Sequence, residues 1–85
     1  MKLKLVEVEW IDITNENSWV DFEDLEKSIA KEQAQTCLSV GYLHKKDAKW
    51  VVILPTVILK DGNIDRCGFE LIPAGCIIRI RHIRR

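Results

Sequence analysis

Two segments decide the fold: VEVEW at 6–10 and IIRIR at 77–81. Apolar and charged residues alternate in both, which is typical of strands with one buried face. An antiparallel pairing of Val8 with Ile80 places two glutamates opposite two arginines, and a one-residue slip would set isoleucine against glutamate. We therefore predict that the first and last strands lie side by side. The structural cross-strand pairs are expected to be Glu7 with Arg81 and Glu9 with Arg79.

The composition fits one small domain over residues 1–85. With 47% hydrophobic and 31% charged residues, the chain is expected to fold rather than remain disordered. The 13 basic and 13 acidic residues give a net charge of 0, which argues against a basic field over the whole molecule. The three cysteines are an odd number and lack CxxC spacing, so we expect reduced thiols and no cysteine-framed zinc site.

No segment resembles an export or membrane signal. Glu7 and Glu9 interrupt the apolar residues near the start, which argues against a signal peptide. The most apolar run, 50–59, contains Pro55 and is about half as long as a membrane-spanning helix. We therefore expect a cytoplasmic protein.

Charge is distributed unevenly along the chain. Residues 1–35 carry 4 lysines and 9 acids, whereas residues 36–85 carry 9 basic residues and 4 acids. The acids gather at 21–26 and the basic residues at 79–85. Either the basic end binds phosphate or an acidic partner, or the two halves neutralise each other within the fold. The predicted cross-strand pairs favour neutralisation.

A helix is predicted over about 19–33, after a loop at 12–17. Ser18 is a favourable N-cap, and the acids that follow it suit the positive end of a helix. An apolar stripe then follows with helical spacing: Phe22, Leu25 and Ile29.

The remaining sequence predicts four strands with short links, at 36–44, 50–59, 64–72 and 76–83. Asp61-Gly62 predicts a tight hairpin turn, and Pro55 a bulge, edge or break. Short antiparallel strands of even spacing favour closure into a small barrel, because closure removes the sheet edges. The expected fold is mainly β, in the order β-α-β-β-β-β, with a helix inserted after the first strand.

The side-chain pattern also predicts which faces are buried. Small residues at 37, 39 and 41 would let the sheet curl sharply. The run 50–59 is apolar on both faces, so we expect it to be covered on both sides. In the following strand, the expected core face carries Cys67, Phe69 and Leu71.

The C-terminal block FELIPAGCIIRIRHI, at 69–83, resembles the ending of SH3-like and Sm-like barrels, where a short turn leads into a closing strand. The residues that match are Ile72, Pro73, Ala74, Gly75, Ile78 and Ile80. This resemblance implies a small SH3-like or Sm-like antiparallel barrel. In Sm proteins the helix precedes the first strand, and their RNA-binding loops match no residues here, so nucleic-acid binding follows only by analogy of fold.

The wider pattern is similar to small uncharacterised proteins encoded by tailed bacteriophages. Its elements are VEWIDI at 8–13, Trp19, SVGYL at 39–43, KWVVILPT at 49–56 and IPAGC at 72–76. These motifs are structural, and the resemblance implies no catalytic residue. It places the chain in the cytoplasm of the host cell.

Residues that could support catalysis are few and dispersed. His44 and His82 are the only histidines, and no spacing links them to a cysteine as metal ligands or as a catalytic dyad. The cysteines all lie on predicted strands, where buried structural thiols are expected. The acids at 21–26 are interpreted as a solvated helix end. We expect no enzymatic activity, no metal and no cofactor.

Aromatic and basic residues supply the candidate binding residues. Trp19 lies off the helix stripe and either anchors the helix to the barrel or sits at an interface with a partner. Tyr42 with Lys45 and Lys46 either forms a stacking and phosphate-binding patch or is a core residue beside a solvated turn. The full set of candidates is Trp19, Tyr42, Lys45, Lys46, Arg66, Arg84 and Arg85.

More apolar surface is predicted than one small core and one helix can cover, so we expect self-association into a dimer or higher oligomer. The leading hypothesis is a non-enzymatic binding module: a phage-encoded accessory protein that engages a host or viral protein, or sequesters a small ligand at a subunit interface. The alternative is a nucleic-acid-binding protein of SH3-like or Sm-like fold that uses a local basic patch.

Overall fold

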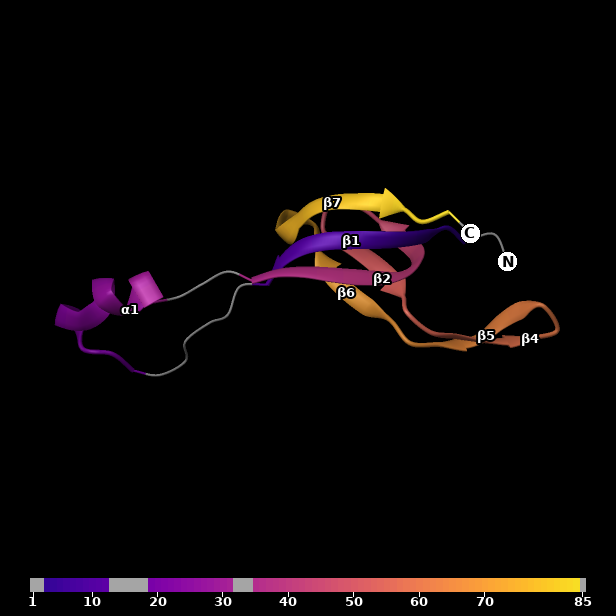
Figure 1. Ribbon diagram of the computed structural model, residues 1–85. Coiled ribbons are helices and arrows are strands. Elements are labelled where there is room, and N and C mark those ends of the chain that lie inside the picture. The colour runs from indigo at the N-terminus through magenta and orange to yellow at the C-terminus, as the bar shows by residue number, and fades with distance from the viewer. Residues whose placement is uncertain (1–2, 13–18, 32–34, 85) are drawn as a thin grey trace.

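The computed structural model describes residues 3–12, 19–31 and 35–84 (Figure 1). Within these described residues, seven strands, one α-helix and two 3-10 turns follow one another. In order, they are β1 (Leu5–Asp12), η1 (Phe22–Asp24), α1 (Leu25–Lys31), β2 (Gln35–Lys46), β3 (Trp50–Leu54), β4 (Val57–Lys60), β5 (Asn63–Cys67), β6 (Glu70–Pro73), η2 (Ala74–Cys76) and β7 (Ile77–His82). The predicted class, mainly β with a short helix after the first strand, is confirmed.

Five of the strands form one antiparallel sheet in the order β6-β3-β2-β1-β7. The first and last strands pair as predicted, with Val8 opposite Ile80 and a register shift after Glu9. Alternation of apolar and charged residues explains this register, because any slip by one residue would bury charges.

The sheet is open, in contrast to the closed barrel predicted from the sequence. Its edge strands are β6 and β7, and no ladder joins them among the described residues. Where β6 ends, the backbone N–H of Ala74 donates to the carbonyl of Lys49 at 2.9 Å, and that of Ile77 donates to the carbonyl of Ala74. The chain therefore passes from the β6 edge of the sheet to the β7 edge through η2. The backbone N–H groups at this crossing donate within η2 and to the β2–β3 turn.

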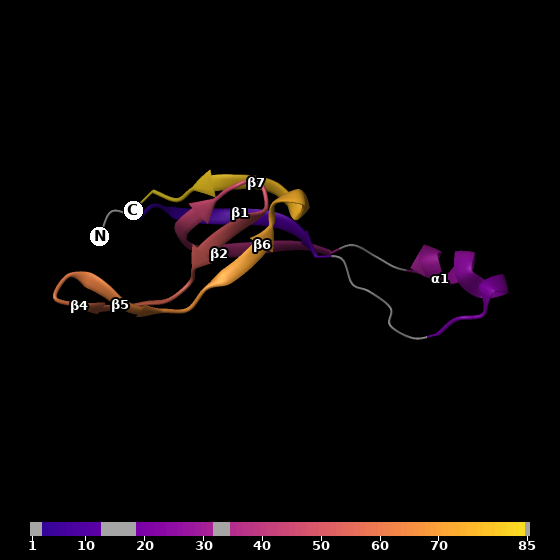
Figure 2. The ribbon, with the colours of Figure 1, turned by 180° about the vertical axis from the view of Figure 1, so that it is seen from behind.

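Two predicted strands are each divided in two. The run 50–59 breaks at Pro55, which has no N–H to give to a ladder, and the run 64–72 breaks at Gly68. At this junction the Gly68 N–H donates to the carbonyl of Thr56 at 2.9 Å. Beyond it, β4 and β5 form a separate hairpin that projects from the sheet (Figure 2). Asp61 and Gly62 turn the hairpin with φ angles of 54° and 79°, as the Asp-Gly pair predicts.

The sheet curls where β2 passes the end of β3. A Cβ atom on Gly41 would lie 2.9 Å from the backbone carbon and oxygen of Leu54, so only glycine allows this approach. The first half of β2 pairs with β1, and its second half pairs with β3. The curl thereby encloses a small core, in line with the small residues predicted on this face.

Five side chains are fully enclosed by the curled sheet: Val6, Val8, Val51, Ile53 and Ile72. Trp10, Leu43, Ile77 and Ile80 pack around them. The predicted core face of the strand at 64–72 is wrong, because Cys67, Phe69 and Leu71 are exposed. The break at Gly68 separates the two halves of this run, and in β6 it is Ile72 that reaches the core. The two-sided cover predicted for 50–59 is likewise wrong, since Ile58 and Leu59 on β4 are exposed and, on β3, Trp50 is exposed and Val52 is only half-buried.

The helix does not pack on the sheet. Residues 19–31, the helical arm, extend beyond the end of β1 and the start of β2, and α1 has no extended packing against any strand (Figure 1). The molecule therefore measures 61 × 23 × 21 Å, and its radius of gyration of 17.4 Å exceeds the ~12 Å typical of a domain this long. The helix is shorter than the predicted 19–33, because residues 19–21 are not helical and a 3-10 turn with the extended Asp21 at its N-cap precedes α1. The predicted N-cap Ser18 and the predicted end at 32–33 lie outside the described residues. Among the described helices, none has the length and apolar character needed to cross a membrane.

Candidate interaction surfaces

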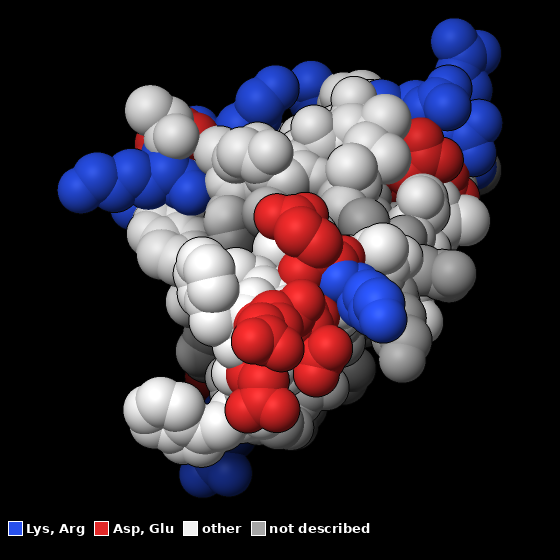
Figure 3. Space-filling view, turned by 90° about the vertical axis from the view of Figure 1, so that its left-hand side faces the viewer, with Lys and Arg blue, Asp and Glu red and all other residues white. Residues whose placement is uncertain are grey.

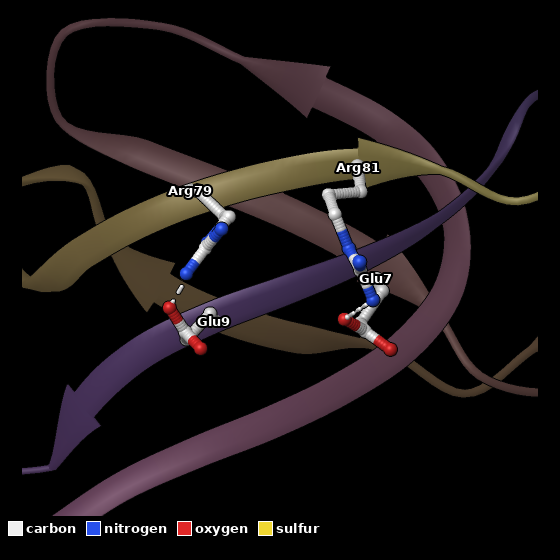
Figure 4. A network of polar contacts seen from close by, with 4 residues as sticks. All are labelled: Glu7, Glu9, Arg79 and Arg81. Carbon is white, nitrogen blue, oxygen red and sulfur yellow. Dashed lines mark hydrogen bonds and ion pairs between the residues drawn. The ribbon is translucent and has the colours of Figure 1, made fainter.

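Two ion pairs bridge β1 and β7 on the outer face of the sheet (Figure 4). Arg79 Nε lies 3.1 Å from Glu9 Oε1, and Arg81 Nη2 lies 2.7 Å from Glu7 Oε1. Both predicted cross-strand pairs are thus present. Half of the arginines near the C-terminus are consequently occupied in holding the register of the sheet.

A network of side-chain hydrogen bonds beside the core joins β1, β2 and β6, and the sequence did not predict it. The indole N–H of Trp10 donates to Ser39 Oγ at 3.0 Å, and the Ser39 hydroxyl donates to Glu70 Oε1 at 2.8 Å. All three side chains are half-buried. Because Ser39 both accepts and donates, it satisfies two polar groups that would otherwise be costly to bury beside the core.

Asp47 organises the β2–β3 turn. Its Oδ1 accepts hydrogen bonds from the backbone N–H groups of Trp50 and Lys49, both at 2.8 Å. Its Oδ2 lies 3.3 Å from Lys45 Nζ. These bonds favour the ionised carboxylate, so the backbone donors, with a smaller contribution from Lys45, hold the pKa of Asp47 below its ordinary value.

The candidate basic residues come from three separate places. Lys45 and Lys46 end β2, Arg66 lies on the β4–β5 hairpin, and Arg84 follows β7. All four are exposed, but Lys45 already pairs with Asp47. Arg85 lies outside the described residues. These four cations therefore lie in three separate places and do not share one strand or turn.

Tyr42 lies in the middle of β2 and is half-buried. In the ladders it stands opposite Leu5 on one side and Leu54 on the other. Its neighbours are thus strand residues, and a bulge between Leu43 and Lys45 separates it from the basic end of β2.

The helical arm presents acidic and apolar side chains together. Asp21, Glu23, Asp24 and Glu26 are exposed, and acids dominate the end of the molecule that faces the viewer in Figure 3. Among its apolar residues, Trp19 is 100% exposed, Phe22 87% and Ile29 54%. Of the two interpretations of Trp19, anchoring of the helix to the barrel is not found, because this side chain is fully exposed.

An apolar groove of about 580 Å³ lies between the sheet and the β4–β5 hairpin. Its lining residues come from the chain start, β2, β3, the hairpin and the segment leading into β6: Leu3, His44, Val52, Leu54, Gly62, Asn63, Ile64, Cys67 and Phe69. No carboxylate is among them. The sequence does not predict the projecting hairpin that creates this groove. Its strands β4 and β5 continue the strand pattern of the segments beside them, β3 and β6.

One histidine and one cysteine, His44 and Cys67, line the same groove, whereas Cys37, Cys76 and His82 lie outside it. Cys67 is exposed in the groove, whereas Cys37 and Cys76 are half-buried, and all three thiols are free. His44 lines the groove, and His82 lies on β7 opposite Val6. Within residues 3–12, 19–31 and 35–84, no three histidine, cysteine or acidic side chains gather as metal ligands would.

Comparisons of the chain with known protein families, curated proteins and solved structures found no match.

Proposed function

We propose that this protein is a non-enzymatic binding module whose helical arm engages another protein. The observation that carries the proposal is the exposure of Trp19 and Phe22 on an arm that has no extended packing against the sheet. Aromatic side chains of this kind dominate the energetics of protein interfaces.

The length of the helix supports the proposal. Isolated helices shorter than about 12–15 residues are marginal in water, and α1 has 7 residues after a 3-residue turn. Such a helix obtains most of its stability from packing its apolar side. A partner that covers Phe22 and Ile29 would supply that packing and would remove exposed aromatic surface from water.

We also propose that the sheet is a variant of the SH3-like or Sm-like barrel, and that the chain acts as an accessory protein of a tailed bacteriophage. The strand order, the sharp curl at Gly41 and the turn that leads from Ile72 into β7 support the first part. The resemblance of the sequence motifs to small phage proteins supports the second. Its partner would then be a viral or host protein, and the site of action the host cytoplasm.

Photo-crosslinking within cells of the native host tests this proposal. A photoreactive amino acid at position 22 should give discrete cross-linked protein products, because this side chain is exposed on the arm. The same group at Ile78, which is exposed on β7, serves as the matched control. Products that also require Trp19 would identify the arm as the binding element, whereas the absence of any product specific to position 22 would refute the proposal.

Nucleic-acid binding remains the alternative proposal, and it has less support. Lys45, Arg79 and Arg81 pair with carboxylates, and the other described candidates, Lys46, Arg66 and Arg84, are exposed on different elements. A binder that uses them would show an affinity that falls steeply with salt. Titration with single- and double-stranded oligonucleotides at about 50 mM salt would detect it.

A further inference from the structure

The helical arm and the apolar groove lie at opposite ends of the molecule. In Figures 1 and 2, the arm extends from one end of the sheet and the β4–β5 hairpin from the other. With a long dimension of 61 Å, the chain holds its arm away from its own groove. The arm therefore does not reach the groove of its own chain, and an arm that enters the groove belongs to another copy.

We infer that the helical arm of one copy docks into the groove of a second copy, and that the exchange is reciprocal. This inference rests on the proposed function and names the partner as another copy of the same chain. Two molecules lying antiparallel, side by side, bring each arm beside the groove of the other. This arrangement closes around a two-fold axis, so both arms and both grooves are covered in one dimer.

The chemistry of the two surfaces is complementary. The groove offers Val52, Leu54, Ile64 and Phe69 to the aromatic side chains of the arm. Its volume of about 580 Å³ falls within the range of sites that enclose drug-sized ligands, which leaves room for more than one aromatic ring. His44 and Asn63 are the polar groups at the groove, and both can donate hydrogen bonds.

Charge favours the same pairing. The arm over residues 19–31 carries four acids and two lysines, a net charge of −2. The sheet and hairpin over residues 3–12 and 35–84 carry nine basic residues and seven acids, a net charge of +2. Because the lining of the groove contains no carboxylate, an acidic arm meets no direct like-charge repulsion there.

The surface of the arm supplies much of the area that a specific dimer needs. Trp19 and Phe22 can each bury about 150–250 Å², so two arms contribute roughly 600–1,000 Å². The groove surface that faces them is smaller, and the total lies near roughly 1,200 Å², the lower end of the range of specific interfaces. The arm aromatics would be the central residues of this interface, surrounded by the acids of the arm.

Sedimentation equilibrium of the full chain over micromolar concentrations tests the inference. We expect a monomer–dimer equilibrium, with a dimer Kd that rises about 30-fold or more in Phe22→Asp. Ile78→Asp introduces the same charge at an exposed apolar position of β7 and should change the Kd by no more than about threefold. Circular dichroism of both variants should retain the β-sheet signal of the parent chain, since neither side chain belongs to the core, and Phe22→Asp should lose helical signal only in step with the loss of the dimer.

Cross-linking between differently labelled copies tests the contact itself. One copy carries Phe22→Cys with its three native cysteines replaced by serine, and the other retains only Cys67, which lines the groove. A short bis-maleimide should join the two copies in a mixed product. The same mixture with Ile78→Cys in place of Phe22→Cys should give much less of it.

The outcomes separate this inference from the proposed function. A dimer that Phe22→Asp leaves intact, or a mixed product no stronger than the Ile78→Cys control, overturns the arm exchange. A monomeric chain whose position 22 cross-links a different protein overturns the exchange and leaves the proposed function standing. A monomeric chain without any product specific to position 22 overturns both. A small molecule retained by a monomer in native mass spectrometry would also contradict the exchange.

Discussion

The curled sheet and the helical arm use their apolar residues in opposite ways. In the sheet, Ile53 is 0% exposed and lies in a core of five enclosed side chains. In the arm, Ile29 is 54% exposed and has no extended packing against the sheet. The same residue type therefore stabilises the monomer in one region and remains available for binding in the other. Substitutions that test each region should separate stability from association.

The largest effect is expected from Ile53→Ala. Removal of a fully buried isoleucine side chain typically costs about 2–5 kcal/mol of unfolding free energy, because a cavity remains. Ile29→Ala, the matched change on the arm, should alter the unfolding free energy of the monomer by no more than about 0.5 kcal/mol. Urea unfolding at low protein concentration measures both. Equal losses would show that the arm belongs to the folded core.

Gly41→Ala should have the next largest effect. The new Cβ would lie 2.9 Å from backbone atoms of Leu54, so the two strands must separate where the sheet curls. Crowding of this kind costs about 1–3 kcal/mol. Gly75→Ala is the control, because its Cβ would meet no heavy atom within 4 Å. Thermal unfolding of the two variants should place only Gly41→Ala well below the parent chain.

A smaller effect is expected from the ion pair between Glu7 and Arg81. A double-mutant cycle with Glu7→Gln and Arg81→Gln should give a coupling energy of about 0.2–1 kcal/mol, since Arg81 is largely exposed. The coupling should weaken as salt is added. A cycle between Glu7 and Arg66, which lies on the hairpin, provides the comparison and should show no coupling beyond error.

The smallest effect concerns Asp47, whose carboxylate faces solvent in the β2–β3 turn. Because its pKa is lowered in the folded chain, its stabilising contribution is complete above the ordinary pKa of 3.8 and is lost as the pH falls through the lower folded value. NMR titration of the side-chain carboxyl should give a midpoint below 3.8.

Substitution of the partner lysine provides the control for Asp47. Lys45→Ala should move that midpoint only slightly, because the backbone N–H groups of Trp50 and Lys49 are the main cause of the shift. An ordinary midpoint in the parent chain, or one restored by Lys45→Ala alone, would contradict this account.

The sequence predicted those elements whose register or turn conformation depends on the residues within the element itself. The alternation in β1 and β7 specified their register, and Asp61-Gly62 specified the hairpin turn, because both signals reside in the residues that make the contact. Closure of the barrel could not be judged in this way. Closure depends on the path of the chain from β6 through η2. That path is held by a hydrogen bond from Ala74 to the distant Lys49, which no local pattern predicts.

The candidate site was less accessible from the sequence. The apolar stripe of the helix was visible, but periodicity cannot tell whether such a stripe faces its own sheet or another molecule. The sequence is accordingly compatible with both interpretations of Trp19. The strand-like alternation of Cys67 and Phe69 predicts that they lie in the core, whereas the break at Gly68 directs them to the groove. The network through Ser39 depends on side chains more than 25 residues apart, which no local pattern encodes.

The pairing of β1 with β7 also brings the two described ends of the chain together. The N–H of Ile83 donates to the carbonyl of Leu5 at 2.9 Å, so the described ends of the chain run together, at the opposite end of the sheet from the arm (Figure 1). A fluorescent or affinity domain fused at either terminus would therefore emerge from the same place. A short linker could join the two termini, and a circularly permuted chain opened at the exposed Asp61-Gly62 turn would keep both the sheet and the arm in place.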